Sequence, residues 1–77
     1  ITKMNYTLPK RSKIIISIYN VLGQEVTTLL NKEQNYGYHT VTWNGADHSG
    51  RQMASGVYFA RMNTKSFTQT KKMLLLK

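Results

Sequence analysis

The sequence is short of several residue types, and each shortage excludes a class of protein. Its 77 residues include no cysteine, which rules out disulfide scaffolds, thiolate metal sites and cysteine nucleophiles. No apolar run approaches the roughly 20 residues that a membrane-spanning helix needs. Hydrophobic residues make up 40% of the chain, too many for a disordered tail. We therefore expect one small domain over residues 1–77, with only about 60% of its unfolded surface buried on folding.

Acidic residues are also scarce, since three Asp and Glu face 11 Lys and Arg and the net charge is +8. Such a charge suits an acidic partner, but it is also common on solvated surfaces. Five tyrosines and a tryptophan make a single-stranded nucleic-acid platform conceivable. However, no aromatic–basic ribonucleoprotein motif is present, and Trp43 and Phe59 fit a core better than a stacking surface. We expect a solvated basic face and no nucleic-acid partner, which leaves the role of the +8 charge open.

Apolar residues recur at a spacing of two, the period of a strand half buried in a sheet. Met4, Tyr6 and Leu8 alternate with polar residues and stop at Pro9, which cannot donate to a sheet ladder. The same alternation predicts strands at 14–19, 26–30, 38–43, 57–62 and 66–77, with turn signals between them. The predicted fold class is all-β: a single antiparallel immunoglobulin-like β-sandwich of six to seven short strands.

The predicted core takes one wall from each sheet of the sandwich. Its expected members are Met4, Tyr6, Leu8, Ile14, Ile16, Ile18, Val26, Val41, Trp43, Val57, Phe59 and Phe67. Leu22, Leu29 and Met53 are expected to close its ends. Trp43 is the largest of these side chains, so we expect it to contribute most to stability.

Residue types that could support catalysis or metal binding occur only in unfavourable patterns. Asp47, His48 and Ser49 are those of a hydrolase triad, but neighbours in a turn diverge, so an Asx-type turn is favoured. Asn44 with Asp47 and Ser49 faintly resembles a calcium loop that lacks its bidentate glutamate. His39 has no second ligand at metal-binding spacing and is expected on a surface or rim. We expect no catalytic residue, no metal site, no cofactor and no enzymatic activity.

Five stretches, taken in order, resemble a known family. They are M-N-Y-T-L-P at 4–9, I-Y-N-V-L-G-Q-E-V at 18–26, W-N-G at 43–45, A-S-G-V-Y-F at 54–59 and K-K-M-L-L-L-K at 71–77. Together they are similar to the type A C-terminal sorting domain of type IX (Por) secretion. That family is related to the immunoglobulin-like domain of flagellar hook-capping proteins. The resemblance covers nearly the whole chain, and the pairing of S-G-V-Y-F with K-K-M-L-L-L-K is its most specific part.

The resemblance implies a non-catalytic secretion signal at the C-terminus of a protein from the Bacteroidetes and relatives. The implied partners are an upstream passenger domain and the translocon, shuttle and sortase components of type IX secretion, with no membrane insertion. The implied route runs through the periplasm to the cell surface, by attachment to lipopolysaccharide, or to the medium. The Asn-Pro-rich segment that often precedes the first strand is missing, so we expect the cleavage region upstream. The chain begins with Ile1, and we take it as excised from a larger secreted protein.

An export signal must be displayed while the domain stays folded, which makes the last strand a candidate. The expected signal residues are Gly56, Lys71, Lys72, Met73, Leu74, Leu75, Leu76 and Lys77. By alternation, the odd-numbered apolar residues of this tail share a face with Phe67 and the even-numbered ones share the other with Lys72. Two interpretations stay open: the tail fills the sandwich, or it awaits strand addition by a partner.

The alternative function is an immunoglobulin-like accessory or carbohydrate-binding module of a secreted enzyme. A carbohydrate-binding module needs an exposed aromatic platform. Tyr36, Tyr38 and Tyr58 are the candidates for such a platform in this sequence.

Overall fold

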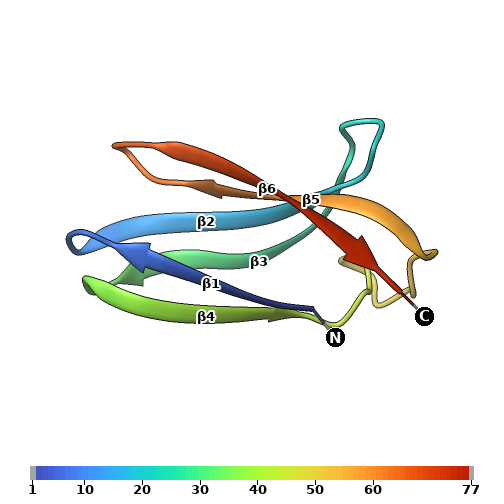
Figure 1. Cartoon of the computed structure of the whole chain (residues 1–77), viewed down its shortest axis with the longest axis horizontal. Helices are drawn as coiled ribbons and strands as arrows, with labels where there is room; N and C mark the ends of the chain where they lie inside the picture. The colour runs from blue at the N-terminus through green and yellow to red at the C-terminus, as the bar shows by residue number, and fades with distance from the viewer. Residues whose placement is uncertain (1, 77) are drawn as a thin grey trace.

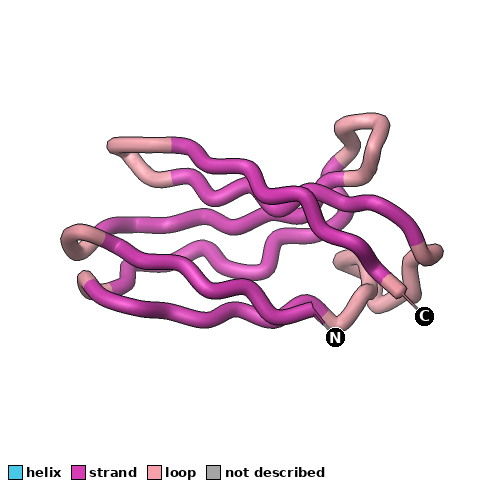
Figure 2. The backbone as a smooth tube through the Cα atoms, in the orientation of Figure 1, coloured by secondary structure: helices cyan, strands magenta, loops and turns pink. Residues whose placement is uncertain are grey.

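Alternating apolar and polar residues produce six strands in this computed structural model, which describes residues 2–76. The strands are β1 (Thr2–Leu8), β2 (Ser12–Tyr19), β3 (Glu25–Gln34), β4 (Gly37–Trp43), β5 (Gly56–Asn63) and β6 (Thr68–Leu75). Strands and connecting loops account for the whole of this described part, without a helix (Figure 2). Accordingly, residues 2–76 include no helix long and apolar enough to cross a membrane. The predicted all-β class and the number of strands are confirmed.

The strands form two antiparallel sheets that face each other across the core (Figure 1). One sheet has two strands, β1 and β4, and the other has four in the order β3-β2-β5-β6. Along one side of the sandwich β4 approaches β3. Near the other side, the Lys71 ammonium on β6 donates a hydrogen bond to the Asn5 carbonyl oxygen on β1, at 3.1 Å. Because β6 pairs only with β5, its outer edge carries no strand partner among the described residues.

The core consists of two adjoining clusters of buried side chains, one toward each end of the 35 Å long molecule. The first, here the tryptophan cluster, consists of Met4, Ile18, Val26, Trp43, Tyr58, Ala60, Met73 and Leu75. The second, here the isoleucine cluster, consists of Tyr6, Leu8, Ile14, Ile16 and Met62. Leu29 and Val41 pack against both clusters and join them. All eight predicted core residues on β1, β2, β3 and β4 other than Val41 are buried.

The prediction for β5 was wrong by one residue. Val57 and Phe59 were expected in the core, but both are only half-buried, and the inward side chains are Tyr58, Ala60 and Met62. Alternation places Arg61 on the same face as Val57 and Phe59. Burying that face would take an unpaired guanidinium out of water, which costs far more than burying a methionine gains.

Three other expectations also need correction. Leu22 was expected to close the core, yet it is 79% exposed in the turn after β2. Phe67 lies in the turn before β6 rather than inside the strand, where it is half-buried and packs against the isoleucine cluster. The third strand was expected to end at Leu30, but β3 continues to Gln34 because it pairs with β2 as far as Ser12.

Candidate docking surface on the four-stranded sheet

The proposed signal residues come together at the open edge of the four-stranded sheet. Gly56 begins β5 and lies directly opposite Leu75 on β6, while Tyr58 lies opposite Met73. Gly56 has a φ of +155°, a backbone conformation that side chains other than glycine's rarely adopt. The strand register thus places Gly56 beside the tail, although 14 residues lie between it and Lys71 in the sequence. Lys77, also a proposed signal residue, lies outside the described residues.

The two faces of the tail have different environments. Met73 and Leu75 point into the tryptophan cluster and are buried. Leu74 and Leu76 point away from it, with 58% and 76% of their surface exposed. The tail thus fills the sandwich with its odd-numbered residues, as the first interpretation expects, and displays its even-numbered ones. Strand addition by a partner stays a prediction.

The two lysines of the tail, Lys71 and Lys72, also have different environments. Lys71 is half-buried, and its ammonium reaches the Asn5 carbonyl oxygen on the facing sheet. Lys72 is exposed on the outer face, where the strand register places it next to Phe59, which in turn lies next to Tyr19. Lys72 is thus the member of the pair that a partner can reach.

Part of this outer face carries a group of apolar side chains together with one lysine, and we call it the outer patch. It consists of Tyr19, Val57, Phe59, Lys72 and Leu74. Val57 and Leu74 are cross-strand neighbours, as are Tyr19 and Phe59. The sequence analysis did not place Val57 and Phe59 on a surface. The position of Arg61 could have done so. It alternates onto the same face of β5 as Val57 and Phe59, and its charge favours exposure of that face to water.

Arg61 extends across the outer patch. Its guanidinium lies over the ring of Tyr19, 4.8 Å from the ring centroid, in a cation–π contact. A shallow pocket of about 210 Å³ opens beside this pair; its lining is Tyr19, Asn20, Val21, Gly23, Phe59, Arg61 and Thr70. The arrangement can bind a mixed apolar and acidic segment, with aromatic surface and a cation next to each other.

The turn after β2 presents further apolar side chains at the margin of the patch. The Asn20 side-chain oxygen accepts hydrogen bonds from the backbone N–H groups of Leu22, at 2.9 Å, and Gln24, at 3.0 Å. Gly23 takes a φ of +82°, which closes the turn. Val21 and Leu22 consequently point into solvent. The I-Y-N-V-L-G stretch is thus the end of β2 followed by a hydrogen-bonded turn with an apolar tip.

The loop after β4 is a structural turn, as predicted. Asp47 accepts hydrogen bonds from the backbone N–H groups of Ser49 and Arg51, each at 2.9 Å, and pairs with the Arg51 guanidinium at 3.0 Å. These bonds, led by the one from the Arg51 backbone, lower the pKa of the Asp47 carboxyl group. His48 Nδ1 lies 3.4 Å from the carbonyl oxygen of Val26 on β3. Within residues 2–76, no three His, Cys, Asp or Glu side chains gather where they could hold a metal ion.

The remaining candidates have structural contacts. The ring of His39 stacks on Tyr6 with centroids 5.3 Å apart, and its Nε2 lies 2.7 Å from the Asn35 carbonyl oxygen. Tyr58, a candidate for an exposed platform, is instead buried edge-on against Trp43, and its hydroxyl donates to the Ala54 carbonyl at 2.7 Å. Tyr36 and Tyr38 are exposed, at 75% and 91%.

Two facing antiparallel sheets with a buried tryptophan define the chain as a small immunoglobulin-like β-sandwich. A family model described as the FlgD Ig-like domain matches residues 2–67, and the chain belongs to this family. The crystal structure of FlgD from P. aeruginosa is similar, with a TM-score of 0.75 and 26% sequence identity. That similarity covers 94% of this chain and 57% of the FlgD chain. No curated protein matches the sequence.

Proposed function

We propose that this domain is a non-catalytic C-terminal secretion signal that directs a passenger protein through the type IX secretion system of a Bacteroidetes-type host. The passenger would lie upstream in the same chain and reach the cell surface or medium through the periplasm. Translocon, shuttle and sortase components would be the partners. The proposal refines membership of the FlgD Ig-like family, whose matched range ends at residue 67, one residue before β6 begins.

The convergence of three stretches on one surface supports this proposal. The stretches 18–26, 54–59 and 71–77 carry much of the resemblance to sorting domains. Their described residues lie on or beside β2, β5 and β6, which are neighbouring strands of one sheet. Each contributes to the outer patch, through Tyr19, Phe59 and Lys72 in a single cross-strand row. A recognition surface requires such convergence, whereas residues needed only for folding could be spread through the core.

The experiment is a fusion of a fluorescent reporter and an N-terminal signal peptide to this domain in a type IX-competent host. Deleting the whole tail would remove the buried Met73 and Leu75 and confound export with folding. Leu74→Glu and Leu76→Glu instead change only exposed side chains. We expect each to leave the melting temperature of the purified domain within a few degrees of wild type while the reporter accumulates in the periplasm.

Thr42→Glu is the matched control because it makes a similar change on the exposed face of β4, in the other sheet. It should leave export at the wild-type level. Normal export of the Leu74→Glu and Leu76→Glu variants would refute recognition of the tail's outer face. Failure of the wild-type fusion to leave the periplasm would refute the sorting function itself.

The second candidate function is an immunoglobulin-like accessory domain of a secreted protein. Membership of the FlgD Ig-like family favours it, as do the two exposed tyrosines of the β3–β4 hairpin. In that case the reporter fusion would stay in the periplasm and the purified domain would bind a ligand or neighbouring domain.

A further inference from the structure

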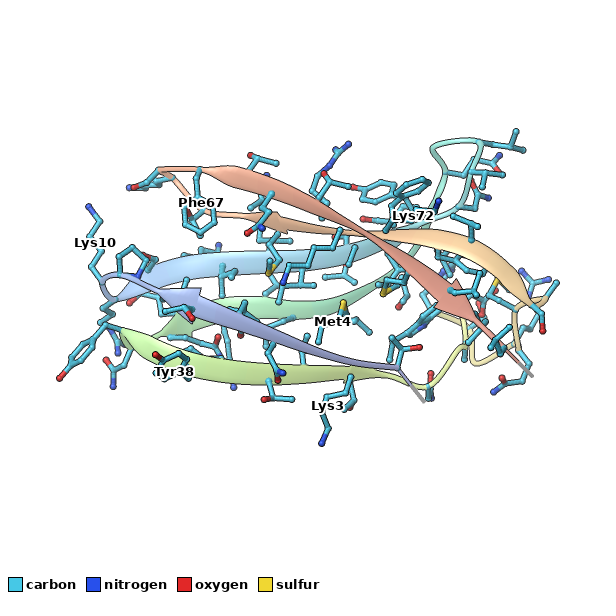
Figure 3. All side chains as sticks on the ribbon, viewed as in Figure 1. Lys3, Met4, Lys10, Tyr38, Phe67 and Lys72 are labelled. Carbon is cyan, nitrogen blue, oxygen red and sulfur yellow. The ribbon has the colours of Figure 1, made fainter. Side chains whose placement is uncertain are left out.

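Three hairpin turns lie at the end of the sandwich opposite the Asp47 loop, and we call this end the hairpin end (Figure 3). The turn between β1 and β2 contributes Lys10 and Arg11, the β5–β6 turn contributes Lys65, and the β3–β4 turn contributes Tyr36. Lys10 extends outward from this end in Figure 3, and Tyr38 lies on β4 close to it. None of these side chains belongs to the core or to the outer patch.

A pocket of about 330 Å³ lies between two of the turns and has an excess of positive charge. Its lining is Lys10, Arg11, Ser12, Lys13, Glu33, Lys65 and Ser66. Four cations thus face one carboxylate, and the Arg11 guanidinium pairs with that carboxylate at 3.0 Å. Lys10, Lys13 and Lys65 form no ion pair among the described residues. The pocket can therefore attract anions, and it also offers two hydroxyl groups as neutral hydrogen-bonding partners.

Two exposed tyrosines, Tyr36 and Tyr38, lie on the β3–β4 hairpin at the same end, and Arg11 of the pocket contacts the tip of that hairpin. The Tyr6 hydroxyl donates to the Gln34 side chain, and Arg11 donates to the Asn35 side chain at 2.8 Å. The His39 contact with the Asn35 carbonyl fixes the same tip from the other side. Tyr36 and Tyr38 therefore project from a backbone that is already ordered, which reduces the entropy lost when a ligand binds.

We propose that the hairpin end binds an acidic polysaccharide, with Lys10, Lys13 and Lys65 pairing with its anionic groups and Tyr36 and Tyr38 packing against its sugar rings. Exposed aromatic rings, cations and neutral hydroxyl and amide groups together suit a chain of charged, hydroxyl-rich rings. Duplex nucleic acid favours a continuous stripe of cations, which the Glu33 carboxylate interrupts in this pocket. The inference names a ligand class for an accessory role and does not depend on export.

The test measures binding of the purified 77-residue chain to a polygalacturonate hexasaccharide by calorimetry at 50 mM and 200 mM salt. The neutral xylohexaose, a dT12 oligonucleotide and phosphatidylglycerol vesicles are the comparison probes. We expect binding to the acidic hexasaccharide that weakens with salt, weaker binding to dT12 and vesicles, and none to xylohexaose. Tighter binding to dT12 or to vesicles, or no binding to the acidic sugar, would overturn the proposal.

Variants locate the site. Losing two partly solvated ion pairs in a Lys10→Ala, Lys65→Ala double variant should weaken binding by about 3- to 30-fold. Lys3→Ala with Lys72→Ala removes the same charge elsewhere on the surface and should change affinity less than twofold. If this control weakens binding as much, net charge alone explains it and the site is wrong. Tyr36→Ala with Tyr38→Ala should also weaken binding without changing its salt dependence, and unchanged affinity would exclude the aromatic contact.

Discussion

The two ends of the sandwich are built differently, although the same six strands run through both. The tryptophan cluster end holds the long loop 44–55 and the tail, and its core contains Trp43, Tyr58 and two methionines. The hairpin end has tight turns and a core made mainly of three aliphatic side chains from β1 and β2, with Tyr6 at its margin. At the first end the long loop and the tail are held by apolar packing together with the hydrogen bonds of Trp43 and Asp47. At the second, side-chain hydrogen bonds of Tyr6 and Arg11 hold the tip of the β3–β4 hairpin.

This difference indicates which substitutions at each end affect folding and which affect binding. Loop 44–55 and the inner face of β6 are tied to the core, so substitutions there change folding before they change recognition. At the hairpin end the side chains of Lys10, Lys65 and Tyr36 are exposed and lie outside the core, so their substitution tests binding with little effect on folding. The predictions below probe this contrast from the largest effect to the smallest.

Trp43→Ala should produce the largest loss. Trp43 is 1% exposed, and its indole N–H donates to the Ala46 carbonyl at 2.8 Å, which anchors the long loop. Truncation should lower the free energy of unfolding by about 3–5 kcal/mol, from a total of about 4–12 kcal/mol for a domain of this length. Urea denaturation followed by far-UV circular dichroism measures this. Leu8→Ala is the matched change at the hairpin end and should cost about 2–5 kcal/mol. A cooperative unfolding transition of Trp43→Ala at nearly the wild-type urea concentration would contradict the expected difference between the two ends.

Gly45→Ala tests the contact between the long loop and the tail. Gly45 has a φ of +82°, and a Cβ there would lie 3.2 Å from Leu75 Cδ1. The left-handed backbone alone should cost about 1–2 kcal/mol. Gly50→Ala is the matched control, since its φ is +87° with no atom near the added Cβ. We expect Gly45→Ala to lower the unfolding free energy more than Gly50→Ala, because Leu75 must also shift. Equal losses would show that the contact is not important.

The sequence was sufficient to predict most of the fold because most strands carry one unambiguous apolar face. In β1, for example, Met4, Tyr6 and Leu8 alternate with exposed polar residues, and only one phase buries them. The last strand was also predicted correctly in phase, since Met73 and Leu75 are inward and Leu74 is outward. The Asx turn at Asp47 followed from the chemistry of its side chain.

Where both faces of a strand are apolar, alternation cannot choose between them. In β5 the residues Val57, Tyr58, Phe59 and Ala60 fit either phase, and the deciding residue is Arg61. The outer patch and the hairpin-end pocket could not be predicted either, because each combines residues from strands or turns far apart in the sequence. Only the strand order β3-β2-β5-β6 places Tyr19, Phe59 and Lys72 in one row.

Tyr6→Phe and Tyr58→Phe compare hydrogen bonding at the two ends. Tyr6 donates to the Gln34 side chain at the hairpin end, and Tyr58 donates to the Ala54 carbonyl at the other. Each substitution removes one hydrogen bond and should lower the free energy of unfolding by about 0.5–1.5 kcal/mol. Similar losses, measured by urea denaturation, would mean that the ends differ in apolar packing rather than in these bonds. If Tyr6→Phe alone lowered the free energy of unfolding by well above this range, the hydrogen bond at the hairpin tip would stabilise the fold more than we expect.

Asp47→Asn should have the smallest effect, and one that depends on pH. Since the folded state lowers the pKa of Asp47, its contribution is present above the unfolded value of about 3.8 and is lost as pH falls through the folded value. Wild-type melting temperature should therefore fall on acidification below about pH 4, and the uncharged carboxamide of the Asp47→Asn variant should remove part of that fall. Thermal melts at pH 7, 5, 4, 3 and 2.5 measure it. Glu33→Gln, at the exposed Arg11 pair of the hairpin end, is the control and should leave the acid dependence nearly unchanged, because that ion pair is well solvated. If Glu33→Gln instead removes the acid dependence and Asp47→Asn does not, polar side chains at the hairpin end stabilise the fold more than the long loop does.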